Sequence, residues 1–342
     1  MLIFLKKAIN DSLGKIGYVV KRTSTIAELE QAASGSAEPE EPSPASTEPE
    51  PAIVAAGESP PERAPLPPII LITMQKSGTT FIRHALETGL NIEHLPFFPP
   101  IENHLNPSGI KQDNTILATH ITHLAPVPVP LISLCLHAER FILHLRDPRN
   151  TCVSWMHHLD RVYLNSEGAY VSDALSMTGS NWANASKEEK LERCIKYYYP
   201  KQLRALAAWI EVLGIDLTGA YIPSKDRVGD SLHNVYLLDG QKIARQFGDE
   251  EMKEYCPPCR TQVLLTTHED LACSGEHLFF NVILDFYGIP KDNFQPPTFN
   301  KDINVHFRTG RTDSWKTEFS PQQQKKVTEQ LPLALRNFFS WE

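Results

Sequence analysis

The sequence predicts an α/β protein with a mostly parallel central sheet, helices on both faces and a phosphate-binding strand–loop–helix. Four short apolar runs, at residues 69–72, 115–119, 141–145 and 263–267, read as strands because they are rich in branched or apolar residues and too short to span a membrane. Helical patterns or helix-start signals follow three of these runs directly. Residues 69–342 are long enough to build one α/β core.

The first strand runs into the segment Met74–Phe81, which has the composition of an anion-binding loop. Small residues there let successive backbone N–H groups turn toward one point at the start of the next helix, where the helix dipole adds positive charge. Lys76 supplies a full positive charge, and further donors come from the hydroxyls of Ser77, Thr79 and Thr80. A nucleotide phosphate is the expected ligand.

Two other interpretations of this loop stay open. An ATP- or GTP-binding loop has the pattern G-x-x-x-x-G-K-[ST], whereas here Lys76 precedes the only glycine, Gly78, by two residues. No apolar strand ends in an evident magnesium-binding Asp. The loop could also be a small-residue turn that only starts a helix.

The strand at residues 141–145 leads into a second candidate phosphate site. Asp147 can cap the following helix and Pro148 fits its first turn. Arg146 stands at the carboxyl end of this strand, and Ser154 follows eight residues later on the helix. An arginine at that edge of a doubly wound sheet can bind a second phosphate.

These segments resemble the sulfotransferases that use 3'-phosphoadenosine 5'-phosphosulfate (PAPS), especially those of the cytosolic type. The family's first motif is P-K-S-G-T-T-W, and here Gln75 replaces the proline and Phe81 the tryptophan. The resemblance implies that Phe81 lies against adenine and that Arg146 and Ser154 bind the 3'-phosphate. It also implies that the 5'-phosphosulfate is wrapped by Lys76, Ser77, Gly78, Thr79 and Thr80.

A third segment, Phe307–Lys316, is similar to the family's R-K-G-x-x-G-D-W-K loop, which closes over the nucleotide. The resemblance places Arg308 and the backbone of Gly310 on the 3'-phosphate. Thr309 stands where the family has lysine, and Ser314 interrupts the end of the motif. The strand that precedes His268 is similar to the family's strand ending in Y-E-D-L, so His268 takes the place of an adenine-contacting tyrosine.

His120 is the candidate catalytic base. Cytosolic sulfotransferases carry K-T-H at a strand end, which aligns with Ala118, Thr119 and His120. A histidine accepts a proton at neutral pH because its unperturbed pKa is about 6.5. We expect His120 to be the first residue past the strand, with His123 farther along the loop. Because Ala118 replaces the lysine, either Lys76 carries more of the charge stabilisation or another cation substitutes. His120 can also be an ordinary loop residue.

The chain divides into three predicted parts. Residues 1–26 form a basic amphipathic segment, which either lies in an anionic membrane interface or packs as a plain terminal helix. Residues 27–68 form an acidic linker rich in Pro, Glu, Ala and Ser, with nine Glu and one Arg. Residues 69–342 form the catalytic domain. We expect a long core helix across Ala185–Leu213 and an insertion at Gly214–Tyr255, near the acceptor entrance.

The sequence therefore predicts transfer of a sulfuryl group from PAPS to a hydroxyl of a glycan, a lipid or a small molecule. We expect no metal, no nucleic-acid partner, and a cytoplasmic location with peripheral membrane contact through residues 1–26. The net charge of −8 lacks the basic excess of a nucleic-acid binder, and six scattered cysteines suit a reducing compartment. Two alternatives remain: a nucleotide-binding scaffold that has lost transfer activity, and an ATP-using kinase.

Overall fold

The computed structural model describes residues 64–96, 110–121, 128–165, 182–227, 233–247, 258–297 and 311–342. Residues 1–26, most of the predicted linker, His123 and the predicted lid residues Arg308, Thr309 and Gly310 lie outside the described residues. Leu66, which the sequence assigns to the linker, is buried, and its amide donates to Asn114 Oδ1 at 2.9 Å.

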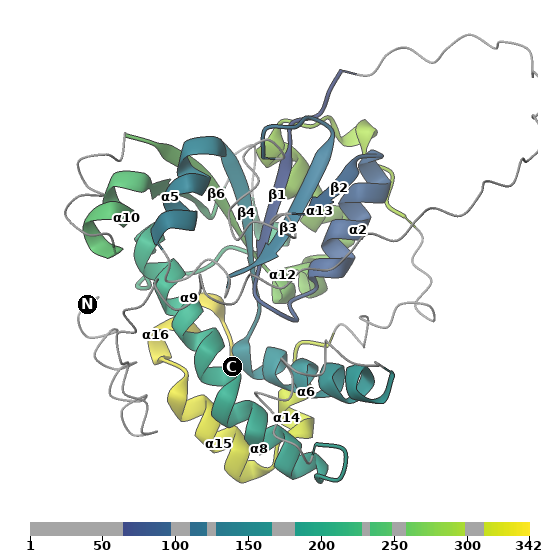
Figure 1. Cartoon of the computed structure of the whole chain (residues 1–342), viewed down its shortest axis with the longest axis vertical. Coiled ribbons are helices and arrows are strands. Elements are labelled where there is room, and N and C mark those ends of the chain that lie inside the picture. The colour runs from purple at the N-terminus through teal and green to yellow at the C-terminus, as the bar shows by residue number, and fades with distance from the viewer. Residues whose placement is uncertain are drawn as a thin grey trace, which may run out of the picture. The chain divides into compact units, whose positions relative to one another are not determined.

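The described strands form one six-stranded sheet in the order β2-β3-β1-β4-β6-β5 (Figure 1). All neighbouring pairs are parallel except β5 with β6, which is antiparallel. The strands are β1 (Ile69–Thr73), β2 (Glu93–Pro96), β3 (Thr115–His120), β4 (Arg140–Leu145), β5 (Val235–Asp239) and β6 (Arg260–Thr267). The predicted fold class is confirmed.

The described helices precede, follow and connect these strands. They are α2 (Thr79–Leu90), α5 (Pro128–His137), α6 (Pro148–Asn165), α8 (Lys187–Tyr197), α9 (Tyr199–Leu213), α10 (Gly240–Phe247), α12 (His268–Ser274), α13 (Glu276–Tyr287), α14 (Ser314–Glu318), α15 (Pro321–Gln330) and α16 (Leu333–Phe339), with short 3₁₀ turns at Ser224–Asp226 and Lys291–Asn293. None of these helices is both long and apolar enough to cross a bilayer.

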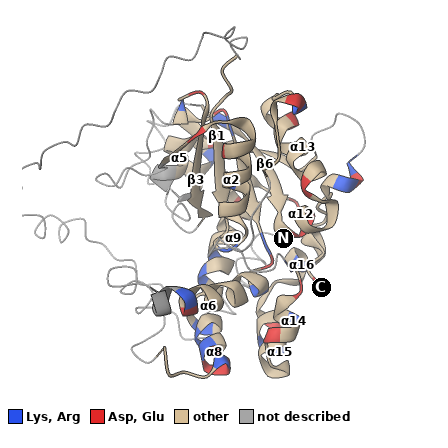
Figure 2. Ribbon diagram, turned by 90° about the vertical axis from the view of Figure 1, so that its right-hand side faces the viewer, with Lys and Arg blue, Asp and Glu red and all other residues tan. Residues whose placement is uncertain are grey.

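The sheet is buried on both faces because its central strands are apolar at nearly every position. In β1, Ile69 and Leu71 pack with α2 and α13, whereas Ile70 and Ile72 pack with α5, α6 and α9. Figure 1 shows α2 and α13 on one side of the sheet and α5 and α10 on the other. β1 and β3 carry no charged residue, and the charges collect on helices such as α8 (Figure 2).

The order of the strands reverses its direction of winding at β1. After β1 the chain builds β2 and β3 on one side of β1, and then places β4 on the other side. In open α/β sheets, ligands bind at the carboxyl ends of the strands where the direction of winding reverses. The loop after β1 and the Arg146 junction after β4 therefore meet at this position.

Three expectations about elements need correction. The helix expected across Ala185–Leu213 is two helices, which divide at Tyr198 because Pro200 lacks an N–H and favours a new first turn. The expected insertion at Gly214–Tyr255 supplies β5, an edge strand of the sheet, and α10. His120 is the last residue of β3 and not the first beyond it.

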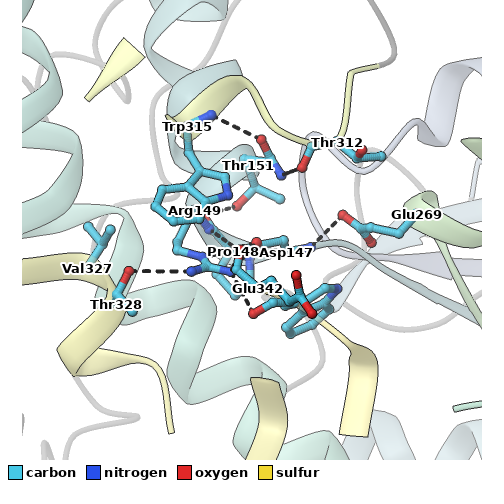
Figure 3. Close-up of polar contacts among 12 residues, drawn as sticks. Asp147, Pro148, Arg149, Thr151, Glu269, Thr312, Trp315, Val327, Thr328 and Glu342 are labelled. Atoms are coloured by element: carbon cyan, nitrogen blue, oxygen red, sulfur yellow. Dashed lines mark hydrogen bonds and ion pairs between the residues drawn. The ribbon is translucent and has the colours of Figure 1, made fainter. Parts of the chain in front are cut away.

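A fully buried ion pair fixes the start of α6 (Figure 3). Asp147 Oδ1 accepts from the Arg149 amide at 2.8 Å, so Asp147 caps the helix as predicted, and its Oδ2 pairs with Arg149 Nη2 at 2.8 Å. The guanidinium lies 3.9 Å from the Trp315 ring centroid and donates to the Trp341 carbonyl at 2.9 Å. The C-terminal segment is thereby attached to the strand–helix junction that carries Arg146.

Replacing Arg149 by methionine should lower the free energy of unfolding by about 3–5 kcal/mol, because Asp147 would stay buried without its cation. Urea denaturation at neutral pH measures this loss. Lys325→Met is the matched control, since Lys325 pairs with Glu329 on the exposed side of α15, and it should leave the midpoint unchanged. A wild-type midpoint for Arg149→Met would contradict a structural role for the pair.

Candidate active site

The loop from Met74 to Gly78 turns sharply between β1 and α2. Lys76 has a φ of 64° and Gly78, at the N-cap of α2, has a φ of 107°. Residues that carry a side chain rarely adopt the backbone conformation of Gly78. A Cβ added at this position would also lie 3.4 Å from His268 Nδ1. Glycine is therefore required at this position, and the loop passes close to His268.

Three successive carbonyls of this loop are each bound by a side chain from another element. Tyr198 Oη donates to the Gln75 carbonyl at 3.1 Å. Arg146 Nη1 donates to the Lys76 carbonyl at 2.8 Å, and His144 Nε2 donates to the Ser77 carbonyl at 3.1 Å. We call Tyr198, Arg146 and His144 the carbonyl clamp.

The carbonyl clamp determines where the loop amides face. In a trans peptide the C=O and the following N–H point in opposite directions. The amides of Lys76 and Gly78 therefore face away from the clamp, while the Ser77 amide closes a turn onto the Met74 carbonyl at 3.2 Å. Together with the start of α2, this arrangement presents backbone donors to an anion.

His144 donates to the Ser77 carbonyl as a buried, neutral side chain. A carbonyl only accepts, so Nε2 carries the proton and Nδ1 accepts from the Thr266 hydroxyl at 2.9 Å. Burial lowers the pKa of His144 to about 4, against the smaller opposing effect of the Ser77 bond. The side chain is therefore uncharged at pH 7.

Polar side chains form a row at the carboxyl ends of four adjacent strands. His120 on β3 pairs in register with Thr73 on β1, Thr73 with His144 on β4, and His144 with Thr266 on β6. Within the row, Thr73 Oγ1 lies 3.0 Å from His120 Nδ1, and it lies 2.6 Å from Thr79 Oγ1 at the start of α2. The predicted base, His120, is thus linked through the single residue Thr73 to Thr79, at the start of the helix that follows the predicted phosphate loop.

Positive charge gathers beside the loop. Burial and, to a smaller extent, the charges of Arg161 on α6 and of Arg146 together lower the pKa of Lys76 to about 8. A lysine in this state gains from an anion that replaces its lost hydration. The neighbouring Ser77 hydroxyl is buried and has no hydrogen-bond partner among the described residues, which suits the same anion.

Arg146 contacts both the loop and the C-terminal segment. Besides the Lys76 carbonyl, it binds the Arg311 carbonyl through Nη2 at 2.8 Å. Arg311 is the first described residue of Phe307–Lys316, the segment predicted to close over the nucleotide. Ser154 is half-buried on α6, and its joint role with Arg146 on a phosphate stays a prediction.

The residues predicted to contact adenine lie on the α2 and α12 side of the loop. Phe81 is half-buried on α2, with its ring centroid 6.3 Å from that of Phe280. His268 is the buried first residue of α12 and faces Gly78. Thr80, the second residue of α2, is half-buried. The contacts of Phe81 and His268 with adenine, and of Thr80 with the 5'-phosphosulfate, stay predictions.

A carboxyl group also titrates near neutrality in this region. Glu269 Oε1 accepts from the Asp147 amide at 3.1 Å (Figure 3), and Oε2 is buried without a hydrogen-bond partner among the described residues. Burial and the charge of Asp147 raise the pKa of Glu269 to about 7. Glu269 is therefore a second group, besides the candidate base His120, whose protonation state can change near neutral pH.

Sequence reasoning missed Thr73, His144, Tyr198, Arg161 and Glu269. A signal existed for Thr73 and His144, because each is a polar residue near the end of an otherwise apolar buried strand. Tyr198, at the α8–α9 junction, and Arg161, on α6, lie more than 80 residues beyond the loop, and only the tertiary fold brings them to it.

Comparison with known protein families finds one matching domain. Residues 66–206 match the family described as the sulfotransferase domain, a stretch that includes Lys76, His120 and Arg146. The match spans less than half of the chain, and over these residues the resemblance to sulfotransferases is confirmed. No curated protein matches the sequence.

Solved structures include a distant likeness. The mouse sulfotransferase SULT7A1 complexed with PAP is 15% identical, with 79% of this chain and 84% of that chain covered at a TM-score of 0.43. A likeness of this size carries no argument about function.

Within the described residues, no three His, Cys, Asp or Glu side chains gather as metal ligands would.

Protonation of His144 should destabilise the protein in acid. Its pKa is near 6.5 when unfolded and about 4 when folded, so the unfolded state binds more protons between these values. The contribution of neutral His144 to the free energy of unfolding is fully present above pH 6.5. It falls by roughly 3 kcal/mol as the pH falls toward 4. Urea denaturation of wild type and His144→Gln across this range isolates the effect.

The stability difference between wild type and His144→Gln should shrink by that amount between pH 7 and pH 4. His277→Gln, at an exposed position on α13, serves as the control and should follow the wild-type curve. Parallel curves for wild type and His144→Gln would show that His144 is not held neutral against the loop.

Proposed function

We propose that this protein transfers a sulfuryl group from PAPS to an acceptor hydroxyl, with His120 as the base. The sulfotransferase domain match supports sulfuryl transfer in general. One observation carries the specific proposal: Thr73 joins His120 to Thr79 by hydrogen bonds, so that the candidate base and the phosphate loop form one site.

The loop supplies the groups that the 5' end of PAPS requires. The amides of Lys76 and Gly78 and the unpartnered Ser77 hydroxyl are donors to phosphate oxygens, with Thr79 and Thr80 beside them. Lys76 adds a cation whose pKa is lowered by burial and by the charges of Arg161 and Arg146, so that a bound anion would favour its charged form. PAPS would bring to this loop a sulfuryl group bonded to its 5'-phosphate.

The remainder of the nucleotide would lie across the crevice. Arg146 and Ser154 would bind the 3'-phosphate, with Arg308, Thr309 and Gly310 closing over it. The hydrogen bond from Arg146 to the Arg311 carbonyl supports this arrangement, because Arg311 belongs to the segment Phe307–Lys316 and follows Gly310 directly. Phe81 and His268 would contact adenine from either side of the start of α2.

In the transfer step, His120 accepts the proton of the acceptor hydroxyl while the oxygen forms a bond to sulfur. Lys76 and the loop amides stabilise the negative charge left on the 5'-phosphate when its bond to sulfur breaks. Arg161 supplies the cation that Ala118 cannot, since its charge already acts on Lys76. The acceptor is a hydroxyl compound: a glycan, a lipid or a small molecule.

Adenosine 3',5'-bisphosphate should bind at least tenfold more tightly than AMP, because only the former carries a 3'-phosphate for Arg146. Charge-assisted hydrogen bonds contribute about 1.5–3 kcal/mol each. Calorimetry on Arg146→Ala should show this preference reduced at least fivefold.

Tyr198→Phe is the matched control, since it removes a clamp on the loop without touching the 3' end, and it should weaken both nucleotides equally. Equal affinity for the two nucleotides in wild type, or an undiminished preference in Arg146→Ala, would rule out the 3'-phosphate site.

Transfer of labelled sulfate from PAPS onto glycan, lipid and phenol pools, in the presence of a metal chelator, tests the activity itself. His120→Ala should lower turnover by roughly a hundredfold or more while retaining nucleotide affinity. Glu269→Gln is the matched control and should retain turnover within a few-fold. His123→Ala should change mainly acceptor affinity.

Each alternative predicts a distinct result in this assay. Nucleotide binding without transfer to any pool would favour the scaffold, and turnover that needs ATP and magnesium would favour the kinase. Near-normal turnover of His120→Ala, with loss in Glu269→Gln, would move the base to the carboxylate.

A further inference from the structure

Thr73 lies between two groups with different predicted roles. Its hydroxyl oxygen is 2.6 Å from the Thr79 hydroxyl oxygen in the phosphate loop and 3.0 Å from Nδ1 of His120. The Thr119 carbonyl is a third neighbour, at 3.3 Å. Thr73 is completely buried in the last position of β1, so water does not compete for these bonds.

A hydroxyl group has one hydrogen, and this fixes the direction of the chain of bonds. If Thr79 donates its hydrogen to an anion, its oxygen can only accept from Thr73. Thr73 then has no hydrogen left for His120, and the neutral imidazole must donate its own Nδ1–H to Thr73.

The tautomer of His120 decides whether it can act as a base. With the proton on Nδ1, the lone pair is on Nε2, the nitrogen that does not contact Thr73. With the proton on Nε2, the lone pair is on Nδ1 and is directed at the Thr73 hydroxyl. Only the first tautomer can accept a proton from an acceptor through Nε2.

We propose that Thr79, Thr73 and His120 form a hydroxyl relay in which phosphate binding selects the Nδ1–H tautomer of His120. Thr73 is a positioning residue, because it acts through His120. The inference rests on the proposed function, since it takes the 5'-phosphate to bind at Thr79. The change of tautomer is neutral: Nε2 releases a proton to water and Nδ1 takes one up.

The relay makes catalytic competence depend on the donor nucleotide. Without an anion at Thr79, the Thr79 hydroxyl is available to donate to Thr73, and Thr73 can donate to Nδ1 of His120 or to the Thr119 carbonyl. Part of the protein then holds the Nε2–H tautomer, which cannot deprotonate the acceptor through Nε2. Bound nucleotide converts this fraction of the protein to the Nδ1–H tautomer of His120.

Nitrogen NMR of the full-length protein labelled with ¹⁵N-histidine tests the relay directly, because Nδ1 and Nε2 resonances report which nitrogen is protonated. His120→Gln identifies the resonances of His120. Saturating adenosine 3',5'-bisphosphate should shift the wild-type signals of His120 toward the Nδ1–H tautomer. The same titration on Thr73→Val should leave the tautomer ratio unchanged.

Two variants control for packing. Thr73→Ser retains the hydroxyl and should retain the response. Thr261→Val removes a buried hydroxyl on β6, which donates to the Ala138 carbonyl, and it should not affect the response. Thr73→Val should lower kcat at least tenfold with the KM for PAPS changed less than threefold, and Thr73→Ser should restore kcat.

The outcomes separate the relay from the proposed function. If wild type binds the nucleotide and His120 does not change tautomer, or is already entirely Nδ1–H beforehand, the relay is wrong and the proposed function stands. If wild type binds no nucleotide, both are wrong. The wild-type titration gives this decision even if Thr73→Val does not fold.

Discussion

The outward orientation of the Gln75, Lys76 and Ser77 carbonyls is the constraint on which the candidate site depends. A loop of this length has as many carbonyl acceptors as amide donors, and it binds an anion only if the acceptors are turned away. The carbonyl clamp of Tyr198, Arg146 and His144 achieves this from the α8–α9 junction, the β4–α6 junction and β4, respectively. The same bonds explain why a histidine and an arginine are tolerated in a buried position.

The parallel sheet is what brings these groups together. In parallel strands, residues in register point to the same face, so polar residues near the strand ends align without any dedicated loop. Thr73, His120 and His144 occupy one such row. The row lies where the strand order reverses, and Thr73 contacts Thr79 at the start of α2. The Arg149 ion pair and the C-terminal segment then secure the β4–α6 junction that carries Arg146. Fold stability and site geometry therefore share the same contacts.

The sequence predicted the parts of the site that are encoded locally. Strand, loop and helix around Lys76, the capped junction at Asp147 and the strand that leads to His120 all follow from short patterns of apolar, small and capping residues. It did not predict that Tyr198 holds the loop or that the charge of Arg161 acts on Lys76, because both residues are distant from the loop in the sequence. The division of the expected long helix at Tyr198 was missed for a different reason: the apolar spacing continues through Pro200, although the backbone hydrogen bonds cannot.

The affinity for adenosine 3',5'-bisphosphate between pH 7 and pH 9.5 tests most directly whether this loop is an anion site that contains Lys76. In the protein without nucleotide, Lys76 has a pKa of about 8, and a bound phosphate would raise this pKa. Binding above pH 8 therefore takes up a proton. The dissociation constant should rise by up to about tenfold per pH unit in this range. Lys76→Arg, which stays charged, should show no such rise. A wild-type dissociation constant that is flat to pH 9.5, or one that rises equally in Lys76→Arg, would contradict the account.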